Sequence, residues 1–124
     1  MNNALISKGD VYWVNMSNVF SAKDIHAQKG RRPCVIVSNN KNNDSNSRVI
    51  IVPLTTQADN LPQHICVYFN GIKNYVVPES ITSVPKSFLD RKAGYLSQKA
   101  FNGYVIKAIK IQLGIWKGDK NERY

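Results

Sequence analysis

Apolar and polar positions alternate in short runs over the first two thirds of the chain, a pattern typical of β-strands. Strand-forming residues occupy 10–16 (DVYWVNM), 33–39 (PCVIVSN), 48–56 (RVIIVPLTT), 64–69 (HICVYF) and 75–81 (YVVPESI). Polar segments rich in Asn, Ser, Asp and Gly separate these runs, and the pair Asn70 and Gly71 indicates a tight hairpin. Five short strands with turn signals between them predict a small barrel or a strongly curved sheet.

Near the C-terminus the hydrophobic period changes from two to that of a helix. Apolar residues recur at intervals of three and four: Phe101, Tyr104, Val105, Ala108 and Ile109. Ser97 is a suitable N-cap and Gly114 suits the position just past the last turn. These signals predict one amphipathic C-terminal helix, so the fold class is mainly β with a C-terminal helix.

Three segments lack a clear period. Residues 17–32 form a long connection, which in a compact domain is uncommon unless it is functional. The asparagine-rich residues 39–46 are predicted to be a loop tip. A short helical turn is expected from Pro85 to Lys92, because proline is tolerated at a first helical position.

Length and composition predict one compact unit. The 124 residues suit one domain, 1–124, with a core of about residues 8–115. No apolar run approaches the roughly 18 residues of a membrane span, and the N-terminus lacks a secretory pattern. We therefore expect a cytoplasmic protein that does not bind membranes. Cys34 and Cys66 lie in apolar runs and are expected to be buried free thiols.

The charge balance favours an anionic partner. Seventeen Lys and Arg against eight Asp and Glu give a formal net charge of +9. Such a field attracts polyanions, with phosphate backbones the first candidate and acidic protein segments the second. A merely solubilising surface has the same composition, so charge alone does not decide.

Potential metal ligands are scattered. His26, Cys34, His64 and Cys66 show none of the paired spacings of zinc sites, so neither a metal nor another cofactor is expected. The chain also lacks a glycine-rich phosphate loop and a serine nucleophile elbow.

The remaining candidates for chemistry lie at predicted strand ends or in loops, from which a small β scaffold usually presents function. They are Arg32 before a strand, Thr55 and Thr56 after one, His26 in the long loop, and Glu79 at the end of YVVPE. A planar guanidinium fixed beside rigid backbone is what a phosphate site uses.

The order of motifs resembles the MazF/PemK toxin family. The motifs are GDVYWVNM, a loop ending HAQKGRRPCVIVSNN, then VIIVPLTT, LPQHICV, VPESITSVPKSFLDRKAGYLS and a final QLGI, from about residue 8 to 115. The resemblance implies an SH3-like barrel of the MazF/PemK/CcdB plasmid-toxin type, a homodimer, and metal-independent cleavage of single-stranded RNA at short sequences. It also implies a cognate antitoxin whose disordered acidic segment covers the RNA groove.

The resemblance carries roles onto particular residues. Arg32 matches the family arginine before proline and is expected to contact the scissile phosphate, while Thr55 matches the threonine whose hydroxyl can donate to a phosphate oxygen. Attack by the RNA's own 2′-hydroxyl needs a base, stabilisation of the crowded phosphorus and an acid for the leaving 5′-oxygen. Glu79 and His26 are candidates for proton transfer, and His26 matches a histidine found in some members.

The chain also departs from the family pattern. Ala27 stands where many members have Glu, and ESITS replaces the common E-Q-x-R-T, which puts base recognition through that segment in doubt. The candidates for RNA binding are Gln28, Lys29, Arg31, Thr56, Ser80 and Thr82. Tyr12 and Trp13 point to opposite faces of the first strand, so one is expected in the core while the other can stack on a base.

Three hypotheses stay open at this level. The first is a toxin endoribonuclease, the second a catalytically weak module that binds RNA or antitoxin, and the third a gyrase-directed toxin on the same fold. Arg32 and Thr55 favour the first, because a gyrase binder has no use for a phosphate-directed arginine.

Overall fold

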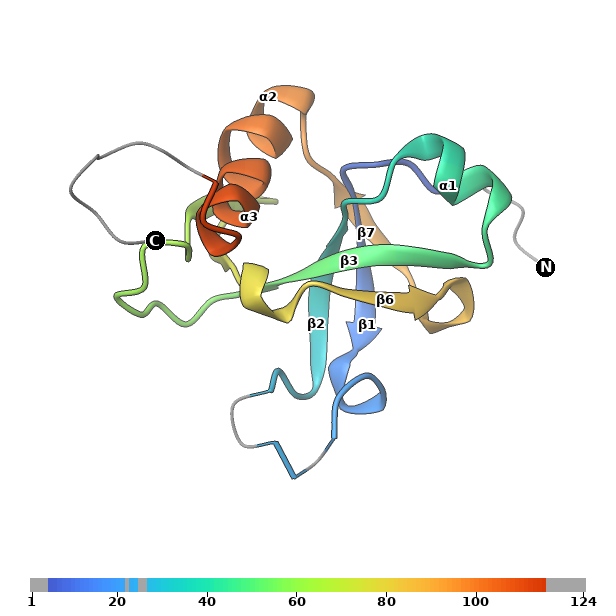
Figure 1. Ribbon diagram of the computed structural model, residues 1–124, viewed down its shortest axis with the longest axis horizontal. Helices are drawn as coiled ribbons and strands as arrows, with labels where there is room; N and C mark the ends of the chain where they lie inside the picture. Colours follow the sequence, from blue (N-terminus) through green and yellow to red (C-terminus); the bar gives the residue numbers. More distant parts are fainter. Residues whose placement is uncertain (1–4, 22, 25–26, 116–124) are drawn as a thin grey trace.

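The computed structural model describes residues 5–21, 23–24 and 27–115, which form a curled antiparallel sheet covered by a C-terminal helix (Figure 1). The strands are β1 (Asp10–Asn15), β2 (Arg31–Ile36), β3 (Arg48–Thr55), β4 (Cys66–Phe69), β5 (Ile72–Val76), β6 (Thr82–Pro85) and β7 (Lys92–Tyr95). Their order is β4-β5-β3-β2-β1-β7, with β6 also paired to β3. This architecture confirms the predicted mainly β fold with a C-terminal helix.

The curl of the sheet depends on β3, which changes partner along its length. Its first half pairs with β6, from Arg48 to Ile51, and its end pairs with β5 at Leu54 and Thr55. Pro53, which has no N–H to donate, lies between these two pairings. The switch turns the β4–β5 hairpin around toward β7 at the other end of the strand order.

Hydrophobic residues on the two faces of the central strands pack into two clusters. One contains Val11, Val35, Val52, Leu54, Val67, Phe69, Val76, Leu96, Phe101, Val105 and Ala108. The other contains Tyr12, Val14, Met16, Cys34, Ile36, Val49, Ile51 and Val84. The C-terminal helix contributes Phe101, Val105 and Ala108 to the first cluster, so its apolar stripe covers one face of the sheet.

The C-terminal helix has the predicted position and caps. It runs through α2 (Gln98–Ala100), a π-helical segment (Phe101–Ile106) and α3 (Lys107–Gln112). The hydroxyl of Ser97 accepts from the Ala100 N–H at 3.1 Å, and Gly114 has a φ of +74° just past the last turn. Among the described residues, no helix is long and apolar enough to cross a membrane.

The prediction of a loop tip at residues 39–46 is wrong, because the segment contains α1 (Asn40–Ser45). The side chain of Asn39 caps this helix by accepting from the Asn42 N–H at 2.8 Å. Asn43 is buried and donates to the carbonyl of Ser38 at 2.9 Å. Side chains that usually favour turns therefore build a short helix here, because each of them finds a local partner.

Two other elements differ from the expectation. The predicted strand at 75–81 ends after Val76, since Pro78–Ser80 is a 3-10 turn. The predicted helical turn at 85–92 is a 3-10 turn at Lys86–Phe88 only, and the chain then enters β7. Strands β6 and β7, four residues each, lacked an alternating pattern long enough to predict them.

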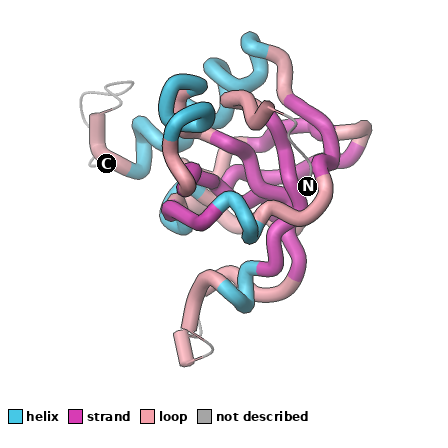
Figure 2. The backbone as a smooth tube through the Cα atoms, turned by 90° about the vertical axis from the view of Figure 1, so that its right-hand side faces the viewer, coloured by secondary structure: helices cyan, strands magenta, loops and turns pink. Residues whose placement is uncertain are grey.

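The long connection between β1 and β2 starts with a 3-10 turn (Met16–Asn18) and projects away from the sheet, as Figures 1 and 2 both show. Its base is closed by two hydrogen bonds: the Met16 N–H donates to the Gly30 carbonyl at 2.8 Å, and the Gly30 N–H donates to the Ser17 hydroxyl at 2.9 Å. The loop is therefore anchored where it delivers the chain into β2.

Candidate active site

A pocket of about 410 Å³ lies where the β4–β5 hairpin approaches β7. Its lining comes from six strands and their ends: Trp13, Arg31, Arg32, Pro33, Leu54, Thr55, Thr56, Phe69, Asn70, Ile72, Asn74, Arg91, Lys92 and Ala93. The fold therefore brings Arg32 and Thr55, which the sequence singled out separately, to one cavity.

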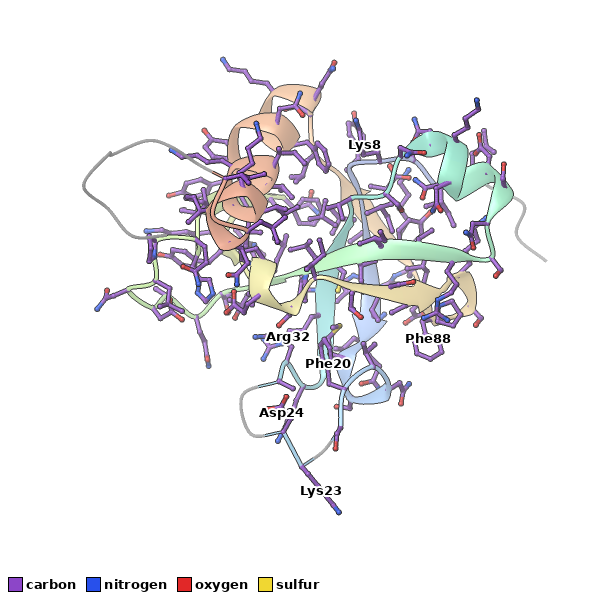
Figure 3. All side chains as sticks on the ribbon, viewed as in Figure 1. Lys8, Phe20, Lys23, Asp24, Arg32 and Phe88 are labelled. Carbon is purple, nitrogen blue, oxygen red and sulfur yellow. The ribbon has the colours of Figure 1, made fainter. Side chains whose placement is uncertain are left out.

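Arg32 is anchored at one point and otherwise available. It stands at the start of β2, where the long loop joins the sheet (Figure 3), and its Nε donates to the carbonyl of Lys29 at 3.1 Å. In the described part of the chain, neither Nη group has a hydrogen-bond partner. The backbone bond holds the guanidinium in place while two donor groups remain for an anion, as bidentate phosphate binding requires.

Thr55 is the last residue of β3 and is buried. Its Oγ1 accepts from the N–H of Gln57 at 3.2 Å, which is the local backbone contact common for a hydroxyl at a strand end. Because this bond uses the oxygen as acceptor, the hydroxyl hydrogen is still available to donate. The local contact thus orients the group without consuming its donor.

Arg31 differs from its neighbour. Its Nη2 donates to Asp90 Oδ2 at 2.7 Å, and its guanidinium lies over the ring of Trp13, 5.1 Å from the centroid. Trp13 lines the pocket, whereas Tyr12 is buried in the core, which decides between the two aromatic residues of the first strand. Burial raises the pKa of Tyr12, the negative charge of Asp10 adds to the rise, and Lys92 opposes it.

The sequence did not single out Arg91 and Lys92. Both line the pocket because β7 pairs with β1, and no local signal reveals that pairing. Lys92 Nζ lies 3.3 Å from Asp10 Oδ1, which offsets its charge. Among the described residues, no Asp or Glu lines the pocket and no ion pair neutralises Arg32 or Arg91. These two guanidinium groups therefore give the cavity a positive charge that attracts anions.

The structure does not bring Glu79 to the pocket. Its Oε2 lies 2.6 Å from Nε2 of His64, whose side chain is only 5% exposed. On the other side of the imidazole, Asp59 Oδ1 is 2.7 Å from Nδ1, although the two atoms lack hydrogen-bond geometry. Ser80 and Thr82 also lie outside the pocket lining, in the segment that follows Glu79.

The loop candidates are only partly described. His26 lies outside the described residues. Lys29 supplies the carbonyl that holds Arg32, and the buried Oε1 of Gln28 has no hydrogen-bond partner in the described chain. Thr56 lines the pocket as an exposed residue next to Thr55.

The described residues contain no group of three His, Cys, Asp or Glu side chains placed to hold a metal ion. Cys34 and Cys66 are free thiols; Cys34 is buried as predicted, whereas Cys66 is only half-buried, so the prediction of burial is wrong for Cys66. Burial raises the pKa of Cys34 to about 12, against the opposing charge of Arg32. Cys34 is therefore a core residue, and its protonated state excludes it as a nucleophile.

A curled antiparallel sheet with a cationic pocket, whose described lining has no carboxylate, defines a basic β domain with the charge to attract polyanions. Sequence comparison identifies the family. The family model described as PemK-like, MazF-like toxin of type II toxin-antitoxin system matches residues 7–113. The chain belongs to this family. The resemblance inferred from the motif order is confirmed.

Individual relatives agree in sequence and in fold. The chain is 30% identical over 117 residues to Endoribonuclease MazF of Staphylococcus saprophyticus, covering 90% of this chain and 93% of the relative. An endoribonuclease of a mycobacterial species, solved in complex with its cognate antitoxin, superposes with a TM-score of 0.68 at 25% identity, covering 94% and 98% of the two chains. MazF from Deinococcus radiodurans, at 20% identity, has the same fold with a TM-score of 0.72 over 90% and 99% of the two chains.

Proposed function

We propose that this endoribonuclease toxin of the MazF/PemK class cleaves single-stranded RNA without a metal ion. The 2′-hydroxyl attacks the adjacent phosphorus, the bond to the 5′-oxygen breaks, and the products carry a 2′,3′-cyclic phosphate and a 5′-hydroxyl. The observation that supports this most is the anchored guanidinium of Arg32, whose Nη donors have no partner among the described residues and which lines the same pocket as Thr55. Among the described residues, the lining contains no carboxylate, imidazole or thiol that could bind a metal ion.

The residues divide the chemical work in the following way. Arg32 stabilises the charge that develops on the phosphoryl oxygens, and Thr55 donates to one of them. Arg91 adds a second positive charge that no carboxylate offsets. His26 is the proposed proton acceptor for the 2′-hydroxyl. Glu79 contacts His64 and lies outside the pocket, so we assign it no step in the chemistry.

The partners follow from charge and from the relatives. The mycobacterial relative was solved with its cognate antitoxin. We propose that an acidic antitoxin segment binds this chain over the cationic pocket and competes there with RNA, in keeping with the net charge of +9. The substrate places the site of action in the cytoplasm.

We also propose a homodimer. Several large apolar side chains are exposed on the isolated chain: Tyr68, Ile72, Tyr95, Tyr104, Leu113 and Ile115. A self-complementary interface would cover part of this surface.

The decisive experiment incubates the purified protein with a long RNA in EDTA and maps both ends of each product. We expect cleavage to persist and the ends to be 2′,3′-cyclic phosphate and 5′-hydroxyl. RNA affinity should also fall with salt, with a log–log slope of about −0.7 per phosphate contact. Activity that disappears in EDTA and returns with a divalent ion would exclude the proposed mechanism.

A further inference from the structure

The β4–β5 hairpin gives the pocket a chemistry different from that of Arg32 and Thr55. Phe69, Asn70, Ile72 and Asn74 contribute one aromatic ring, one aliphatic side chain and two amides, and Trp13 adds a second ring from β1. Unpaired RNA bases are recognised by stacking on aromatic or guanidinium planes and by hydrogen bonds to their edges. This lining suits a base better than a sugar or a phosphate.

The aromatic walls are held in place. Phe69 is 7% exposed and packs against Gly94, where a Cβ would lie 3.0 Å from the phenyl Cζ. Glycine at position 94 therefore makes room for the ring, and its φ of +154° also suits glycine. Trp13 is fixed by the guanidinium of Arg31 over its ring. A base that enters the pocket meets a rigid surface, so its binding loses little side-chain conformational entropy.

Asn74 is the most informative polar group in the lining. Its side chain is 4% exposed, and its Nδ2 donates to the carbonyl of Ile72 at 3.1 Å. Because a carbonyl can only accept, this bond fixes the orientation of the Asn74 amide, with Nδ2 toward Ile72. The amide oxygen Oδ1 is then an acceptor for which the described residues supply no donor. Asn70 follows the same rule, because its Nδ2 donates to the carbonyl of Ala93 at 3.2 Å. The two amides thus both keep an unused acceptor oxygen.

We propose that this part of the pocket is a subsite for a nucleobase that bears an exocyclic amino group, at a nucleotide flanking the cleaved phosphate. Asn74 is its specificity-determining residue. The inference rests on the proposed RNA cleavage and adds the class of base. The amino group of adenine, cytosine or guanine offers two hydrogens to the acceptors, whereas uracil has one N3–H between two carbonyl oxygens and leaves at least one of the oxygens of Asn70 and Asn74 without a donor. An acceptor left unpaired in a buried site costs free energy, so uracil is rejected.

The test uses short RNAs with one cleavable linkage, all other 2′-hydroxyls being replaced by 2′-deoxy groups. The base on each side of that linkage is varied among adenine, cytosine, guanine, uracil and unsubstituted purine, which has the shape of adenine without its amino group. Single-turnover rates at subsaturating enzyme are measured for the wild type, Asn74→Ala and Asn102→Ala. Asn102, exposed on the C-terminal helix, is the matched control.

For one flanking position we expect the wild type to cleave the adenine substrate about tenfold faster than the unsubstituted-purine substrate, the size of one good base contact. Asn74→Ala should lose this ratio and Asn102→Ala should keep it. Equal rates with the wild type at both positions, or an unchanged ratio in folded Asn74→Ala, would overturn the subsite while leaving RNA cleavage intact. If the folded wild type cleaves none of these RNAs and no long RNA, the proposed function itself fails.

If Asn74→Ala does not fold, the subsite is tested by the ratio of the adenine rate to the unsubstituted-purine rate, measured for the wild type and for Asn70→Ala. A wild-type ratio near one then overturns the subsite. A ratio of about ten that Asn70→Ala reduces supports it.

Discussion

Arg31 and Asp90 form an ion pair of 2.7 Å that links the start of β2 to the turn before β7. Adjacent Arg32 has no such partner among the described residues, so two neighbouring arginines have different electrostatic states. Both members of the pair are at least half exposed, and a pair of this kind contributes little to stability. Its main effect is to reduce the positive charge that Arg31 offers to RNA.

Arg32→Ala should lower the single-turnover cleavage rate by about two to three orders of magnitude, the usual effect of removing one preorganised donor. Binding of an uncleavable RNA should weaken far less, since the lost interaction is strongest in the transition state. Arg32→Lys should recover only part of the rate, because an ammonium lacks the planar fork. Melting curves establish that each variant is folded. A folded Arg32→Ala protein with the wild-type rate would mean that this arginine is not catalytic.

Asp90→Asn should raise RNA affinity at low salt, because it frees the charge of Arg31 and removes a negative charge beside the pocket. Arg31→Ala should weaken binding modestly and leave the chemical step nearly unchanged. Fluorescence anisotropy with an uncleavable RNA at several salt concentrations measures both effects. Asp44→Asn, at an exposed position in α1, is the matched control for lost negative charge. An equal gain in both Asn variants would show that only net charge matters.

Thr55→Val keeps the branched shape of the side chain but removes the hydroxyl. We expect cleavage to slow by about a hundredfold, the lower end of the effect of one lost donor, because a neutral hydroxyl donates more weakly than a guanidinium. The melting temperature should change little, because the bond to the Gln57 N–H is a single local contact near the surface. Ser45→Ala, which removes an exposed hydroxyl from α1 outside the pocket lining, is the control. If both variants retained the full rate, the hydroxyl would have only a structural role.

Arg91→Ala tests the cation that only the fold revealed. RNA affinity should fall and the salt slope should become shallower by about 0.7, as expected for one lost phosphate contact on a single strand. Lys110→Ala removes an exposed charge from α3, outside the pocket, and should leave the slope unchanged. Equal changes in the two variants would indicate a diffuse charge effect instead of a contact at Arg91.

The thiol of Cys34 should resist alkylation in the native protein. With its pKa raised to about 12 by burial, almost no thiolate exists near pH 8, and the side chain is inaccessible as well. Half-buried Cys66 should react first. Mass spectrometry after iodoacetamide treatment, with and without denaturant, counts the modified sites. Native labelling of Cys34 at the rate of Cys66 would contradict the buried position.

The free energy of unfolding should also fall as the pH rises above about 9, the ordinary pKa of a cysteine thiol, toward about 12, the raised pKa of Cys34 in the folded chain. Over that range the unfolded chain releases the thiol proton while the folded chain retains it, so high pH favours unfolding. Urea unfolding of the wild type and Cys34→Ala across this range isolates the contribution. The variant should show a shallower fall.

Local sequence determined the elements whose residues suffice to specify them. Alternation of bulky and small or polar residues located β1 to β4, and Ser97 and Gly114 marked the two ends of the C-terminal helix. The order of motifs also singled out Arg32 and Thr55, which the fold places in one pocket. These features depend on neighbours in the chain, which a pattern can report.

Tertiary structure decided which of these elements meet. β6 is a strand because it pairs with β3, and β7 because it pairs with β1; neither has a pattern of its own that predicts this. The same pairings bring Arg91 into the pocket, and the turn of the β4–β5 hairpin brings Asn74 there, while Glu79 is left beside His64. The physical reason is that strand pairing joins residues far apart in sequence, and their register depends on the packing of the whole core, which no local period encodes.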